Sequence, residues 1–248
     1  MNYRDRIYEK YTTTVHRLAE DSDVRAFDRW GDAYDTYMRG WLPVEKDAPI
    51  VDVACGYGRL LRYFTKRGFT NVLGVDISPE QVEYAKKLHS NVVQSDVLEF
   101  LKTHPGEFAL ITAFDIIEHF QKDEVLDFLD ACFLALRPGG RLVLQTPNGD
   151  TPWGLMHRYN DFTHELGFNP TSMGWILKLC GFERFEAREQ GPVPRSITSV
   201  CRFTLWKLLR AKMLFHNLVE TGSMGSGVLT RVFISSAVRP HGGNGAPS

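Results

Sequence analysis

Short apolar runs alternate with amphipathic segments along the middle of the chain. The runs that predict buried strands are residues 50–53, 72–75, 91–94, 108–114 and 142–145. Residues 125–136 repeat apolar side chains at helical spacing, and Pro138-Gly139-Gly140 is expected to end that helix. Strands that alternate with helices predict an α/β fold, in which helices cover both faces of a mostly parallel sheet.

The remaining pattern divides the chain into five parts. A helix is expected at residues 171–179, a sixth strand at 182–188 and a seventh at 228–238. The parts are a helical cap at 1–48, an α/β core at 49–188, a helical insert at 189–227, the last core strand at 228–238 and a disordered tail at 239–248. The cap is rich in tyrosine and tryptophan, and we expect it to pack on the core or to cover its pocket.

Composition limits the function classes. Of the 248 residues, 43% are hydrophobic and 24% are charged, which is ordinary for a globular protein. The net charge of −1 argues against nucleic acid as a partner. The four cysteines lie far apart, without C-x-x-C spacing or a signal peptide, which favours reduced thiols. No apolar run is long enough to cross a bilayer. We therefore expect a cytoplasmic protein, at most peripheral to a membrane.

A glycine turn follows the first predicted strand. Residues 50–60 read I-V-D-V-A-C-G-Y-G-R-L, with Gly56 and Gly58 between the strand and a helix. Glycines admit unusual backbone angles, and a helix N-terminus attracts anionic groups, so a nucleotide-like ligand is the first hypothesis. A dinucleotide fingerprint would need a third glycine where the chain has Leu61, so that pattern fails.

Polar residues gather where the predicted strands end. They are Asp52, Asp76, Asp96, Asp115, Glu118 and His119. Ligands of open α/β sheets bind outside the carboxyl ends of the strands. Asp76 follows the glycine turn at about the distance expected of an acid that accepts hydrogen bonds from ribose hydroxyls. Each acid alone could be a solvated loop residue, but several at consecutive strand ends predict a binding site.

Five segments together resemble the successive motifs of class I S-adenosylmethionine (AdoMet) methyltransferases. They are V-D-V-A-C-G-Y-G at 51–58, G-V-D-I-S at 74–78, S-D-V at 95–97, F-D-I-I-E-H at 114–119 and L-R-P-G-G at 136–140. The resemblance implies a Rossmann-like, doubly wound sheet of seven strands. It also implies AdoMet-binding residues: Asp52, Ala54, Gly56, Gly58, Asp76, Ile77, Asp96, Val97 and Phe114. Asp52 would face the ammonium group, Asp76 the ribose, and Asp96 with Val97 the adenine. Ala54 departs from the family pattern, where glycine stands, and should slightly crowd the turn.

The chemistry expected is an in-line attack on the methyl group of AdoMet, for which a hydroxyl acceptor must lose its proton. The acid-x-x-Glu-His spacing resembles a cluster in metal-dependent methyltransferases, including ubiquinone-pathway enzymes and small-RNA 2′-O-methyltransferases. The catalytic candidates are Glu118, His119 and His164, and Asp115 joins them as a candidate ligand of Mg²⁺, Mn²⁺ or Zn²⁺. Two alternatives stay open. Either histidine could act as a general base without metal, or the residues could only orient a loop.

The insert contains a basic amphipathic segment at residues 196–219. Such a helix can lie on an anionic membrane surface, accept an anionic substrate, pack on its own domain or contact a second copy in a homodimer.

One short segment bears on the identity of the methyl acceptor. Residues 161–170, D-F-T-H-E-L-G-F-N-P, are similar to methyltransferases of bacterial polysaccharide assembly. That resemblance implies O-methylation of a sugar hydroxyl on a glycan or glycan precursor. The alternatives are a small aromatic or natural-product acceptor, methylated on oxygen or nitrogen, RNA 2′-O-methylation, and an AdoMet-binding subunit without turnover.

Overall fold

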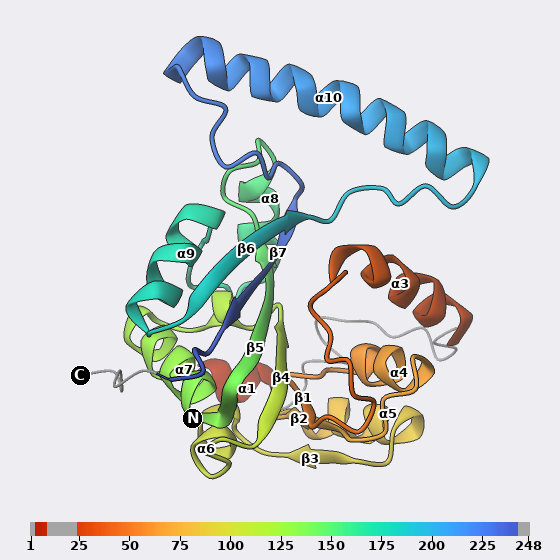
Figure 1. The fold of residues 1–248 in the computed structure, drawn as a ribbon, viewed down its shortest axis with the longest axis vertical. Coiled ribbons are helices and arrows are strands. Elements are labelled where there is room, and N and C mark those ends of the chain that lie inside the picture. The colour runs from red at the N-terminus through yellow and green to blue at the C-terminus, as the bar shows by residue number, and fades with distance from the viewer. Residues whose placement is uncertain (1–2, 9–23, 243–248) are drawn as a thin grey trace.

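The protein is built around one seven-stranded sheet, in strand order β3-β2-β1-β4-β5-β7-β6 (Figure 1). The structure, a computed structural model, describes residues 3–8 and 24–242. The strands are β1 (Ile50–Val53), β2 (Val72–Asp76), β3 (Val92–Gln94), β4 (Phe108–Phe114), β5 (Leu136–Pro147), β6 (Glu183–Glu189) and β7 (Val232–Val238). Only β7 runs antiparallel to its neighbours, β5 and β6. The predicted Rossmann-like, mostly parallel sheet of seven strands is confirmed.

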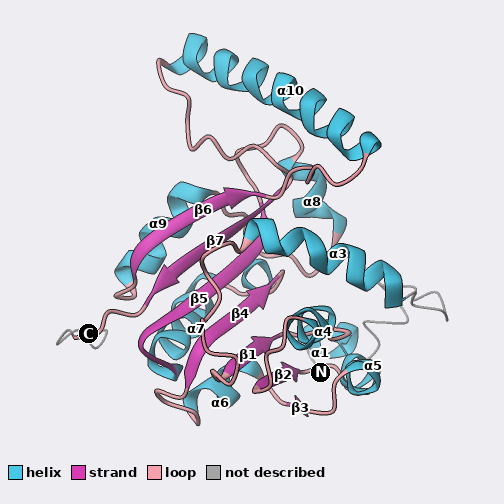
Figure 2. Cartoon of the chain, turned by 45° about the vertical axis from the view of Figure 1, so that its right-hand side comes forward, coloured by secondary structure: helices cyan, strands magenta, loops and turns pink. Residues whose placement is uncertain are grey.

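Successive residues of the central strands enter opposite cores because strand side chains alternate between the two faces. In β1, Ile50 joins one core and Val51 the other, and Leu110 and Ile111 of β4 divide in the same way. Helices cover both faces (Figure 2). The core of Ile50 is completed by α3 (Val24–Tyr37), α4 (Arg59–Lys66) and α5 (Pro79–Leu88), and the core of Val51 by α6 (Val97–Lys102), α7 (Lys122–Ala135) and α9 (Pro170–Leu179).

The helix expected at 125–136 differs from the structure at its end. α7 stops at Ala135, and Leu136 already begins β5, so the Pro-Gly-Gly sequence lies inside a strand rather than in a turn. The pairing of β4 with β5 shifts register between Phe108 and Leu110, which accommodates the irregular start of β5. The prediction that the Pro-Gly-Gly sequence ends the helix was therefore wrong, because α7 stops at Ala135, before the chain reaches Pro138.

The seventh strand starts later than expected. β7 begins at Val232, although the apolar pattern starts at Val228. The side-chain amide of Asn148 donates to the carbonyls of Val228 and Thr230, at 2.8 and 2.9 Å, so these groups do not join the strand ladder.

The tail expected to be disordered from residue 239 is in part well anchored. The N–H of Arg239 donates to the carbonyl of Gly140 at 2.9 Å, and its guanidinium donates to carbonyls at the end of α7, those of Phe133 and Leu134 among them. That part of the prediction was wrong, and residues 243–248 lie outside the described chain.

The cap and the insert supply the remaining helices. In the described part of the cap these are α1 (Tyr3–Tyr8) and α3. A short helix, η1 (Ile117–His119), follows β4, and α8 (Gly154–Asn160) follows β5. The insert forms the 25-residue helix α10 (Ile197–Thr221). None of the helices described is both long and apolar enough to span a membrane.

Candidate active site

A cavity of about 340 Å³ opens at the carboxyl ends of the parallel strands, and residues from the ends of β1, β2 and β4 line it. The chain order of the sheet reverses between β1 and β4, which is where open α/β sheets bind ligands. We refer to this space as the cofactor cavity.

The two glycines of the turn after β1 have different roles. Gly56 has φ +54 and lines the cavity, and its N–H donates to Oδ2 of Asp76 at 2.8 Å. Gly58 caps the N-terminus of α4 with φ +78, and a Cβ there would lie 3.3 Å from Cβ of Ala85. Gly58 therefore permits close packing of the turn against α5, whereas Gly56 leaves space beside the ligand.

Asp76 ties the ends of two turns together. Its Oδ1 accepts from the N–H of Ser78 at 2.9 Å, while Oδ2 accepts from Gly56. The residue is 7% exposed, and burial raises the pKa of its carboxyl. Since Asp76 lines the cavity, its carboxylate is available to a ligand from a fixed position.

The structure separates the nine predicted cofactor residues into two groups. Those that line the cavity are Ala54, Gly56, Asp76, Ile77, Asp96 and Val97; those that do not are Asp52, Gly58 and Phe114. Asp52 lies behind the turn, where its Oδ1 accepts from the Thr112 hydroxyl at 2.6 Å, and burial raises its pKa to about 7. Phe114 packs against Tyr34, with ring centroids 5.4 Å apart. Contact of these three residues with AdoMet stays a prediction.

α1, which belongs to the predicted cap, covers one side of the cavity with Arg4 and Tyr8. Arg4 was not predicted from the sequence, and its guanidinium binds both carboxylate oxygens of Glu124 at 2.8 Å. Gln81 of α5 also lines the cavity, and its buried Oε1 has no hydrogen-bond partner among the described residues. The Arg4 contact spans 120 positions along the chain, so no local pattern could reveal it.

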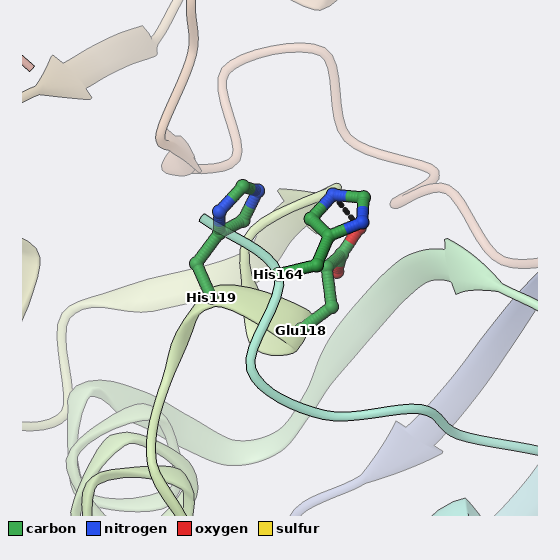
Figure 3. A group of neighbouring side chains, drawn as sticks. All are labelled: Glu118, His119 and His164. Atoms are coloured by element: carbon green, nitrogen blue, oxygen red, sulfur yellow. Dashed lines mark ion pairs between the residues drawn. The ribbon is translucent and has the colours of Figure 1, made fainter. Parts of the chain in front are cut away.

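Glu118, His119 and His164 come together beside the cofactor cavity (Figure 3). One potential ligand atom from each lies within 4.8 Å of the others, and His119 lines the cavity. The carbonyl of Glu118 accepts from the N–H groups of Glu165 and Leu166, at 2.8 and 3.1 Å. This pairing holds the loop of His164 against η1, and therefore explains how residues 45 positions apart meet.

Hydrogen bonds fix the same tautomer in both histidines. The Thr163 hydroxyl donates to Asp161 at 2.6 Å, so it can only accept from Nδ1–H of His119, 2.8 Å away. Nδ1 of His164 lies 3.0 Å from the carbonyl of His157, which can only accept. The Nε2 lone pair of each ring is therefore free for a proton or a cation. Burial, together with the neighbouring His164, lowers the pKa of His119 to about 4.

The third member, Glu118, is 1% exposed. Its Oε2 accepts from the Thr146 hydroxyl at 3.0 Å, whereas no described group donates to Oε1, which lies 3.9 Å from Nε2 of His164. Burial and the nearby Asp115 raise the pKa of Glu118 well above its usual value. Two imidazole lone pairs and an unpartnered carboxylate oxygen fit a divalent cation, and the bonds at Nδ1 resemble the outer hydrogen bonds of metal-binding histidines.

The fourth predicted ligand, Asp115, lies outside the group of three. Its Oδ2 accepts from Nε2 of Gln145 at 2.8 Å, and burial raises its pKa to about 6. Oε1 of Gln145 in turn accepts from Tyr34 and Gln190, at 2.7 and 2.6 Å, so this glutamine joins the cap and the end of β6 to the cavity wall. A role for Asp115 as a metal ligand stays a prediction.

The sheet and the position of the cofactor cavity match the class I AdoMet-dependent methyltransferase fold. A family model described as a methyltransferase domain matches residues 3–186, and the chain belongs to that family.

The curated relatives include proteins named ubiquinone biosynthesis O-methyltransferase. The protein of Psychrobacter cryohalolentis is 34% identical over 110 residues, which are 40% of this chain and 40% of that protein. The protein of Xanthomonas campestris is 30% identical over 156 residues, 55% of this chain and 64% of that protein. The chain thus spans less than two thirds of the length of these relatives.

Solved structures share the fold at low identity. An Archaeoglobus fulgidus AdoMet-dependent methyltransferase matches with TM-score 0.61 and 18% identity, covering 96% of this chain and all of that one. A Haemonchus contortus phosphoethanolamine N-methyltransferase in complex with AdoMet matches with TM-score 0.62 and 16% identity, over 94% of this chain and 60% of that one.

Proposed function

We propose that the protein transfers the methyl group of AdoMet to a hydroxyl oxygen of its acceptor. The observation that carries the proposal is the position of His119, whose side chain lines the cofactor cavity and also belongs to the group with Glu118 and His164. An acceptor hydroxyl placed at this group would meet hydrogen-bond acceptors next to the methyl donor. The curated relatives named O-methyltransferases support oxygen as the accepting atom.

The two histidines are the groups that can accept the proton of the acceptor hydroxyl. Either Nε2 lone pair, of His119 or His164, can take the acceptor proton, because both Nδ1 atoms are committed to other groups. Bound AdoMet supplies a methyl group on a positively charged sulfur, so that the new C–O bond forms as the C–S bond breaks and its electron pair stays on sulfur. The protein's main tasks are to align the acceptor and to hold its proton.

A divalent cation is part of the proposal. Glu118 through Oε1 and the two histidines through Nε2 would hold it, and nitrogen ligands beside one carboxylate favour Zn²⁺ or Mn²⁺ over Mg²⁺. When bound, such a cation lowers the pKa of a hydroxyl next to it. A histidine base acting without metal is the alternative.

Exposed apolar side chains favour an acceptor with an apolar or aromatic part. They belong to the segment that leads to His164 and are Trp153, Leu155, Met156, Tyr159 and Phe162. Phe162 also meets the ring of Tyr3 at 6.2 Å between centroids. Clustered exposed apolar residues usually mark a binding surface. The relatives whose names refer to ubiquinone biosynthesis support the same acceptor class.

A sugar hydroxyl on a glycan or a nucleotide-linked precursor is the second candidate. A separate cavity of about 320 Å³ is lined by Arg29, Arg195 and Arg202 together with Tyr37. Three guanidinium groups suit the phosphates of a nucleotide-linked or lipid-linked sugar. None of the relatives described above is named for sugar methylation.

The test is transfer of labelled methyl from AdoMet to a panel of substituted phenols and catechols, nucleotide sugars, glycans, amines and RNA. It is run with EDTA and with Mn²⁺ or Zn²⁺ restored. Label in aromatic hydroxyls that EDTA abolishes and a metal restores is the expected result. Label in the sugar fraction promotes the second candidate, and EDTA-resistant label removes the metal.

Label on amines alone would overturn O-methylation. AdoMet binding without transfer to any acceptor would instead indicate a binding subunit. The Asp76→Ala variant is the control at an AdoMet concentration near the wild-type Kd, since it is expected to bind the cofactor more weakly while Glu118 and both histidines remain.

A further inference from the structure

The longest helix of the described chain, α10, stands outside the layered body (Figures 1 and 2). None of its 25 residues is buried. Most of the stability of an amphipathic helix comes from burying its apolar face. Because α10 buries no residue, its packing on its own domain contributes little to its stability.

The inner side of α10 is nevertheless attached at defined points. Nε of Arg210 donates to the carboxylate of Glu189 at 3.0 Å, and its NH2 group donates to the carbonyl of Gly227 at 2.7 Å. The ring of Trp206 lies so close to Gly191 that a Cβ there would be 3.1 Å from Nε1. These contacts fix which side of the helix faces away from the protein.

The outer side carries an apolar stripe, which we define as Ile197, Val200, Leu208, Phe215, Leu218 and Val219. Intervals of three, four, seven and eight residues place these side chains on one face. Ile197 is 87% exposed, Leu208 64% and Phe215 66%. Lys207 and Lys212 lie on the two flanks of the stripe, both exposed. Apolar residues between lysines are typical of helices that lie in a membrane interface.

The charges of α10 distinguish between two occupants of the stripe. The helix has four basic residues and one acidic residue, Glu220, a net charge of +3 with histidine neutral, on a chain of net charge −1. In two helices paired in parallel through the stripe, residues five apart on opposite flanks face each other, so Lys207 would meet Lys212 of a second copy. An antiparallel pair also brings flanks with lysine together. Repulsion between these lysines disfavours a second copy as the occupant of the stripe. An anionic surface, by contrast, is complementary to the positive charge of α10.

We propose that α10 docks the protein on an anionic lipid surface. The apolar stripe enters the boundary between headgroups and acyl chains, and Lys207 and Lys212 lie among the headgroups. The helix lies on the bilayer and does not cross it, consistent with the lack of a spanning helix in the described residues.

The topology gives this docking a direction. β6 and β5 both run antiparallel to β7, so β6 ends at the same edge as β5, the edge at which the cofactor cavity opens. α10 follows β6 after a short linker. Docking therefore brings the acceptor side of the protein close to the membrane.

The test is flotation of the full chain with vesicles of phosphatidylcholine, with and without about one third phosphatidylglycerol, at low and high salt. The expected result is salt-sensitive binding to the anionic vesicles only. Double substitution Leu208→Glu with Phe215→Glu, and separately Lys207→Glu with Lys212→Glu, should each weaken binding about tenfold or more.

Matched controls carry the same chemical changes elsewhere. Lys86→Glu with Lys87→Glu repeats the charge change on exposed positions of α5, and Val44→Glu repeats the apolar change at a residue 87% exposed. Both should bind vesicles as the wild type does. Phe215→Ser is a milder variant if the double substitution fails to fold, as judged by circular dichroism.

Equal binding to neutral and anionic vesicles, no binding, or equal losses in the α5 control would overturn the proposal. A dimer in light scattering that Leu208→Glu dissociates, without vesicle binding, would also overturn it and assign the stripe to a second copy. Vesicle binding needs no methyl acceptor, so its outcome is independent of the proposed reaction.

Discussion

The hydroxyl oxygen of Thr163 lies 2.8 Å from Nδ1 of His119 and donates its single proton to Asp161. The threonine therefore acts as an acceptor toward the ring and leaves Nε2 of His119 without a proton. Thr163 and Asp161 belong to the segment that leads to His164, and this contact gives that segment a physical role. It orients a histidine 44 positions earlier in the chain.

Replacing Thr163 by valine keeps the shape and removes the acceptor. We expect kcat to fall about 10- to 100-fold, the range found when outer-shell partners of histidines are lost, while the Kd for AdoMet and the melting temperature stay near wild type. Single-turnover methyl transfer and calorimetry measure these quantities. Thr163→Ser retains the hydroxyl and should restore most of the rate. Wild-type turnover in the valine variant would exclude this positioning role.

His119→Ala and His164→Ala should each reduce turnover far more than AdoMet binding, by about 100-fold or more if the residue holds the acceptor proton. Parallel measurement of kcat and of the AdoMet Kd separates the two effects. His157→Ala is the control, because its side chain lies in the same region but outside the group of three. A variant that retains the wild-type rate removes that histidine from the mechanism.

The sequence was informative wherever the physics is local. Periodicity predicted strands such as residues 108–114, which form β4 in the structure. The prediction failed where distant groups compete for the backbone. The side-chain amide of Asn148 donates to the carbonyls of Val228 and Thr230, so β7 begins later than the apolar pattern predicts.

The same limit applies to the site. The sequence spacing placed Glu118 and His119 in one candidate site, and the family resemblance added His164. No local pattern could show that Gln145 accepts hydrogen bonds from Tyr34 and Gln190. Its donation to Asp115 could not be predicted either. Nor could the glycine turn show that Gly58 is required by Ala85 rather than by the ligand. Side chains joined across strands depend on the completed fold.

Ala54 has φ +53, the left-handed region that favours glycine. That conformation costs an L-residue about 1–2 kcal/mol, while glycine loses about 0.5–1 kcal/mol through its greater freedom in the unfolded chain. Ala54→Gly should therefore stabilise the protein by about 0.5–1 kcal/mol, measurable by urea unfolding, without weakening AdoMet binding. Destabilisation would mean that the methyl group makes a packing contact worth more than the strain.

Asp52 predicts a pH dependence of stability. Burial raises its pKa from 3.8 to about 7, so between these values the native state keeps a proton that the unfolded chain has lost. Stability must then fall as pH rises through this window. Asp52→Asn still accepts from Thr112 and has no proton to lose. The free energy of unfolding of Asp52→Asn, relative to that of the wild type, should therefore increase by on the order of 2 kcal/mol between about pH 5 and pH 8.

Urea unfolding at both pH values tests this. Asp127→Asn, at an exposed position of α7, is the control and should show no such growth. Parallel curves for Asp52→Asn and the wild type would contradict the buried, protonated state.

Asp76→Ala should weaken AdoMet binding by about 10- to 100-fold, the loss expected when hydrogen bonds to a charged group disappear. The carboxylate also accepts from Gly56 and Ser78, so part of the loss could come from a displaced turn. Asp76→Asn distinguishes the two causes, since its single carbonyl oxygen keeps one backbone contact. Glu83→Ala removes an exposed carboxylate from α5 and should change nothing. Calorimetry that finds the wild-type Kd in a folded Asp76→Ala variant would refute the ribose assignment.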